Sequence, residues 1–65
     1  MRLTINGEPQ EIEAATVADA LAALNLGEAR VATALNGQFV PADARRAAAL
    51  SPGDTLEILS PMQGG

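Results

Sequence analysis

The chain has no cysteine and no histidine among its 65 residues. Without cysteine it can form no disulfide, and it has no thiolate to act as a nucleophile or a metal ligand. Without histidine it lacks the commonest acid–base group near neutral pH and the commonest metal ligand. Tyrosine and tryptophan are absent as well, and Phe39 is the single aromatic residue. The chain therefore cannot build the aromatic platforms on which nucleic-acid bases stack.

Positive charge is also scarce, since four arginines face eight carboxylates and the net charge is −4. This balance repels phosphate backbones and favours a positively charged protein partner. No apolar run approaches the roughly 20 residues that cross a membrane, and the alternating residues 1–6 do not resemble a signal peptide. We expect no nucleic-acid or membrane partner and a cytoplasmic location.

A chain of this length forms one small domain and buries only about 60% of its unfolded surface, which leaves little room for a catalytic cavity. The neighbouring carboxylates Glu11 and Glu13 are better interpreted as a solvated acidic face than as an acid–base pair, because nothing nearby separates their pKa values. Arg45 and Arg46 are similarly more typical of a solvated turn than of an anion site.

The first residues predict a β-hairpin. Apolar and polar residues alternate through Leu3 and Ile5, and Asn6-Gly7 then favours a two-residue turn. The return strand would cover residues 8–13. Because Pro9 cannot donate a ladder hydrogen bond, we expect this strand at a sheet edge.

A helix is predicted to begin after Thr16, whose hydroxyl can cap the first turn, with Asp19 three residues later. One apolar stripe follows, formed by Val17, Ala20, Leu21 and Leu24. Gly27, just past the stripe, is the expected end of the helix.

Three further strands are expected at residues 31–35, 39–40 and 55–59, the first two joined by Asn36-Gly37. One or two helical turns are expected within the alanine-rich residues 42–50. The order of elements predicts a two-layer α+β fold, a mixed sheet of about five strands covered on one face by one main helix. Residues 1–59 would form the domain and residues 60–65 a flexible tail.

The tail ends in Gly64-Gly65, which has no side chains and can thread a narrow channel. Adenylation by ATP would activate the Gly65 carboxylate, and a sulfur nucleophile could then displace AMP to leave a thiocarboxylate. A frayed end that happens to contain glycines explains the same residues, and the tail alone does not decide between the two.

Four segments together resemble the ThiS family of thiamin-biosynthesis sulfur carriers. The most specific is Gly53–Leu59 followed by a tail ending in Gly64-Gly65, and the others are Ala34–Pro41, Leu3–Glu8 and Thr16–Leu21. This resemblance covers nearly the whole chain. It implies a ubiquitin-like β-grasp fold.

The resemblance also implies a carrier and not an enzyme. A ThiF-like activating enzyme would adenylate Gly65 with ATP, the carrier itself binding no cofactor or metal. Sulfur mobilised by a cysteine desulfurase would form the thiocarboxylate, and a thiazole synthase would take it for the thiazole ring of thiamin. Met62, Gln63 and Gly64 would give the enzymes access to Gly65.

Leu35 and Leu59, with Met62, are the candidates for an apolar surface that docks the activating enzyme; the alternative is that the two leucines belong to the core. Other functions remain open at this point. They are sulfur transfer for molybdopterin synthesis, attachment to target proteins as a ubiquitin-like modifier, and a plain interaction module.

Overall fold

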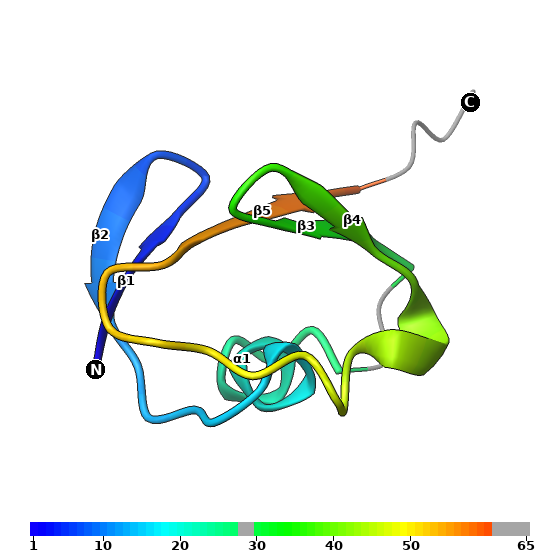
Figure 1. Ribbon diagram of the computed structural model, residues 1–65, viewed down its shortest axis with the longest axis horizontal. Helices are drawn as coiled ribbons and strands as arrows, with labels where there is room; N and C mark the ends of the chain where they lie inside the picture. The colour runs from blue at the N-terminus through cyan, green and yellow to red at the C-terminus, as the bar shows by residue number, and fades with distance from the viewer. Residues whose placement is uncertain (28–29, 61–65) are drawn as a thin grey trace.

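The computed structural model describes residues 1–27 and 30–60, which form one sheet and one main helix (Figure 1). The order of elements agrees with the order expected from the sequence. The elements are β1 (Arg2–Ile5), β2 (Glu8–Glu11), α1 (Val17–Ala23), β3 (Ala32–Leu35), β4 (Gln38–Val40), the 3₁₀ turn η1 (Ala42–Ala44) and β5 (Thr55–Leu59).

The strands lie in the order β2-β1-β5-β3-β4. β5 pairs parallel with β1 and antiparallel with β3, while β1–β2 and β3–β4 are antiparallel hairpins. The sheet is therefore mixed, as expected. Pro9 lies in the edge strand β2, opposite Thr4, which confirms its predicted position at an edge.

Both hairpins turn through an Asn-Gly pair in the left-handed region of backbone space. The φ angles are 51° and 86° at Asn6 and Gly7, and 50° and 85° at Asn36 and Gly37. Two consecutive positive φ angles are the requirement of a type I′ turn, whose twist matches that of the flanking strands.

The start of α1 agrees with the prediction. The Thr16 hydroxyl oxygen accepts a hydrogen bond of 3.2 Å from the Asp19 amide. The Asp19 carboxylate in turn accepts one of 3.2 Å from the amide of Ala15, the residue before the cap. These bonds satisfy donors at the helix start, and the carboxylate lies near the positive end of the helix dipole.

The predicted end of α1 at Gly27 is wrong. The helix stops at Ala23 and the chain turns at Asn25, where φ is +62°. The Leu26 amide donates to the Leu21 carbonyl at 2.7 Å and the Asn25 amide to the Ala22 carbonyl at 3.1 Å, the bonds of a Schellman motif. Asparagine tolerates the left-handed conformation, so no glycine is needed, and Leu26 then folds back onto the core.

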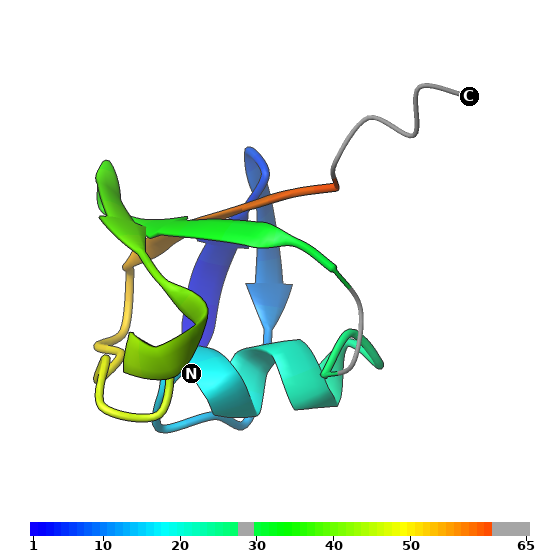
Figure 2. The same ribbon diagram turned by 90° about the vertical axis from the view of Figure 1, so that its right-hand side faces the viewer.

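Helix α1 covers one face of the sheet, and the core lies between these two layers (Figure 2). The opposite face of the sheet, which we call the outer face, is not covered by any described helix. None of the described helices is long and apolar enough to cross a bilayer. The buried cluster consists of Leu3, Ile5, Ile12, Val17, Ala20, Leu21, Leu50, Leu56 and Ile58.

Of the helical turns expected within residues 42–50, only η1 forms. The chain beyond it runs back along the start of α1 (Figure 1). The amides of Ala18 and Val17 donate to the carbonyls of Arg45 and Ala48 at 3.1 and 2.9 Å. This segment therefore satisfies the first amides of the helix, which have no partner within it.

Candidate functional site

The central strand β5 leads to the C-terminal residues. It lies between β1 and β3, and Ser60 follows it as the last described residue. The predicted site residues Met62, Gln63, Gly64 and Gly65 lie outside the described residues.

Two turn asparagines hold β5 from opposite sides through their side-chain amides. Asn6 donates from Nδ2 to the Ile58 carbonyl at 3.0 Å and accepts at Oδ1 from the Ile58 amide at 2.8 Å. Asn36 accepts at Oδ1 from the Thr55 amide at 2.9 Å and donates to the Asp54 carboxylate at 3.1 Å. These bonds fix the orientation of β5 between its two neighbouring strands.

The outer face carries the two large apolar side chains that are exposed among the described residues. Phe39 is 69% exposed and Leu59 is 65% exposed. Ala34 lies opposite Phe39 and Ala32 opposite Leu59 in the strand register. Because successive side chains in a strand alternate between faces, these four residues share the outer face, and we call them the outer-face patch.

Leu35, the other predicted contact, lies on the face that α1 covers. Its partner in the register is the fully buried Leu56, and it packs against the core. The sequence did not single out Phe39. A usable signal was present, because Phe39 and Val40 are neighbours in one strand and only one of them can face the core.

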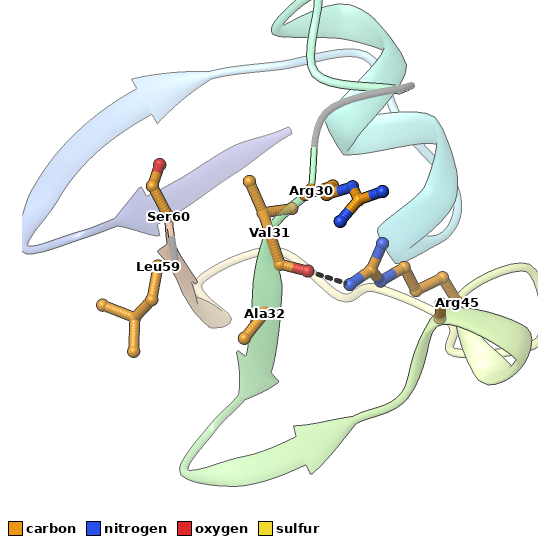
Figure 3. A pocket seen from close by; sticks show the side chains of 7 residues that line it. Arg30, Val31, Ala32, Arg45, Leu59 and Ser60 are labelled. Carbon is orange, nitrogen blue, oxygen red and sulfur yellow. Dashed lines mark hydrogen bonds between the residues drawn. The ribbon is translucent and has the colours of Figure 1, made fainter. Parts of the chain in front are cut away.

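A groove of about 500 Å³ opens where β5 ends and β3 begins (Figure 3). The guanidinium groups of Arg30 and Arg45 lie side by side on one wall, and Leu59 and Ser60 lie across from them. Its lining consists of Arg30, Val31, Ala32, Ala42, Arg45, Leu59 and Ser60.

Arg45 is held in this groove and is not the solvated turn residue expected from the sequence. Its Nη2 donates to the Val31 carbonyl at 2.5 Å and its Nε to the Thr33 hydroxyl at 3.2 Å. Thr33 is 1% exposed and donates in turn to the Val40 carbonyl at 2.7 Å. Arg46 is exposed, as expected.

Carboxylates are the candidate acid–base and metal-binding groups of the described residues. No three carboxylates among them lie close enough to hold a metal ion. Glu11 forms ion pairs with the Met1 amino group at 3.5 Å and with Arg2 at 3.8 Å, and Glu13 lies beyond the end of β2. Glu11 is therefore a solvated surface group and not half of an acid–base pair.

Comparisons with known proteins agree with this geometry. The profile of the ThiS family matches residues 3–65. The crystal structure of the thiamine biosynthesis protein ThiS from Geobacter metallireducens is 36% identical, with a TM-score of 0.83 and all of both chains covered. An NMR solution structure of a thiamine biosynthesis protein from the same organism is 35% identical, with a TM-score of 0.80, covering all of this chain and 88% of the other. No curated protein sequence matches significantly.

A five-stranded mixed sheet in this order, with one helix on one face, defines a ubiquitin-like β-grasp protein. Within that class the match covers nearly the whole sequence and both solved structures align over its full length. The chain belongs to the ThiS family, the sulfur carriers of thiamine biosynthesis.

Proposed function

We propose that this chain carries sulfur as a thiocarboxylate on Gly65 and delivers it, in the cytoplasm, for the thiazole ring of thiamin. The observation that carries the proposal is the family match through residue 65, the residue whose carboxylate would react. The described domain supports it, because it contains no His, no Cys and no clustered carboxylates, so activation falls to other proteins.

The chemistry begins at the carboxylate. An oxygen of Gly65 attacks the α-phosphorus of ATP on a ThiF-like enzyme, pyrophosphate leaves, and an acyl adenylate forms. A cysteine desulfurase supplies sulfur as a persulfide, which two thiol groups reduce to hydrosulfide as they form a disulfide. The hydrosulfide then attacks the carbonyl carbon. AMP leaves with the former carboxylate oxygen, a proton is released, and a thiocarboxylate remains for the thiazole synthase.

The geometry of β5 suits this delivery. Five residues follow Ser60, and a chain of that length extends at most about 18 Å. The two asparagine side chains hold β5 at Thr55 and Ile58, so the domain presents the start of this segment in a defined direction. Glycine at the end permits a close approach of backbone to the enzyme's catalytic groups.

The docking surface belongs to the same proposal. Leu59 and Phe39 supply exposed apolar area on the outer face, and Leu59 directly precedes the segment that the enzymes must grasp. Leu35 supports this surface only indirectly, because its side chain faces α1 and packs against the core. An exposed apolar patch at the exit of β5 is suited to bind the activating enzyme.

The test is thiocarboxylate formation on the intact chain. The protein is incubated with ATP, a ThiF-like enzyme, a cysteine desulfurase, cysteine and a thiol reductant, and its mass is followed. We expect one oxygen-to-sulfur exchange, located at Gly65 by fragmentation. A chain of the same sequence with an amidated C-terminus is the control, since it retains the domain but has no carboxylate to adenylate.

Exchange in the amidated chain, or none in the free chain under conditions that convert a known ThiS protein, would contradict the proposal. Transfer of the sulfur to a thiazole synthase, and not to a molybdopterin synthase subunit, would then assign the pathway.

A further inference from the structure

Two positive charges lie together in the groove at the end of β5, although the whole chain has a net charge of −4. Figure 3 shows the guanidinium groups of Arg30 and Arg45 next to each other. Among the described residues, the only ion pairs are those of Glu11 with Met1 and Arg2. Two like charges held side by side repel each other, and an anion placed between them would lower that energy.

Arg45 is oriented before any ligand arrives. Its bonds to the Val31 carbonyl and to the buried Thr33 hydroxyl use one hydrogen of Nη2 and that of Nε. Arginine has five N–H donors in a rigid fork, so these two bonds leave three donors for a ligand. An arginine that is already fixed loses little conformational entropy when it binds a carboxylate.

The rest of the lining selects the kind of anion. Val31, Ala32, Ala42 and Leu59 add apolar side chains to the lining, which suits an anionic group on a hydrocarbon stem. Phosphate sites commonly use several backbone amides. The amides of Val17, Ala18 and Asp19 at the start of α1 already bond to Ala48, Arg45 and Thr16, and none of the three donor residues lines the groove.

We propose that this groove receives the carboxylate side chain of a glutamate or aspartate on a partner protein. The assignment of that partner rests on the proposed function. An enzyme acting on Gly65 has to hold a segment that begins at Ser60, and Ser60 and Leu59 line the groove. Its surface then covers the groove while the reaction proceeds, and an acidic side chain there pairs with both arginines.

A first experiment needs no enzyme. The Nε–Hε signals of the four arginines are followed by NMR while N-acetylglutamate amide, which has one side-chain carboxylate, replaces chloride at constant ionic strength. We expect the Arg30 and Arg45 signals to shift along one saturable curve, with Arg2 and Arg46 as internal controls. Equal shifts at all four arginines, or saturation by inorganic phosphate alone, would overturn the carboxylate site.

A second experiment measures affinity for the ThiF-like enzyme at low salt. Arg30→Glu should weaken binding about ten-fold or more, because it places a like charge opposite the partner's carboxylate. Arg46→Glu changes the net charge equally but lies outside this groove, and it should stay within about two-fold. Equal losses of affinity in the two variants would show that only long-range attraction between the proteins acts, and would overturn the site. ATP–pyrophosphate exchange on the unaltered chain separately tests adenylation, so its failure would refute the proposed function while the NMR result still decides the groove.

Discussion

Asn6 and Asn36 show how much one residue can contribute beyond its place in a turn. The sequence predicted both as turn residues, because Asn-Gly tolerates positive φ. It did not predict that their side chains bond to β5, at Ile58 and Thr55. That contact depends on a strand about 50 positions away for Asn6, and no local pattern reports it.

Asn6→Gly should lower the free energy of unfolding by about 1–2 kcal/mol, since two hydrogen bonds to Ile58 are lost while the positive φ remains accessible. Urea unfolding measures the change. Asn25→Gly is the matched control, because Asn25 has a similar φ of 62° and no side-chain hydrogen bond among the described residues. An equal loss in both variants would assign the effect to the flexibility of glycine in the unfolded chain.

Leu59→Asp should reduce adenylation of Gly65 about ten-fold or more while leaving the fold intact, because the side chain is 65% exposed and central to the proposed docking surface. Adenylation is measured by ATP–pyrophosphate exchange. Ala22→Asp adds the same charge at an exposed position of α1, in the layer on the other side of the core. It should have little effect on adenylation. Unchanged kinetics in Leu59→Asp would remove Leu59 from the partner surface.

At the scale of elements, periodicity predicted every strand and the main helix, because each apolar set must face one core. It did not assign faces correctly for short strands. Leu35 and Leu59 were grouped as one surface, yet the register places Leu35 opposite buried Leu56 and Leu59 opposite exposed Ala32. Which face each residue takes depends on pairing with another strand. The predicted end of α1 at Gly27 is wrong because Asn25 adopts the left-handed conformation that a glycine was expected to adopt.

Helix α1 has only seven residues, too few to be stable alone in water. Its caps and its packing must therefore stabilise it. Thr16→Ala should lower the free energy of unfolding by about 1 kcal/mol, because the Asp19 amide loses its acceptor. Thr16→Ser keeps a hydroxyl and should lose at most about half as much. Denaturant unfolding of the two variants measures the difference, and equal losses would place the effect in the Thr16 methyl group.

At the scale of the whole molecule, the core is small and the stability correspondingly limited, about 3–5 kcal/mol for a single core of this size. The length of the sequence leads to the same limit, which stays a prediction. The sequence did not predict the groove, because Arg30 and Arg45 come from separate segments that only the folded sheet brings together. Arg45 beside Arg46 indicated a turn, and its contact with Val31 and Thr33 is tertiary.

Leu56→Ala should cost about 2–5 kcal/mol and leave much of the protein unfolded at 25 °C, because Leu56 is fully buried at the centre of the sheet. Leu59→Ala removes the same atoms from the same strand at an exposed position and should change stability by no more than about 0.5 kcal/mol. Circular dichroism during thermal unfolding compares them. Similar melting temperatures would show that the face assignment of β5 is wrong.

The central position of β5 also affects how the protein is made. The β1–β2 and β3–β4 hairpins pair with β5 and not with each other, so the sheet is complete only after the ribosome has released Thr55–Leu59. A nascent chain that lacks this strand has two hairpins that do not share one sheet, and its sheet is incomplete. A chain that stops before β5 therefore has no finished domain to offer an enzyme that selects folded carriers.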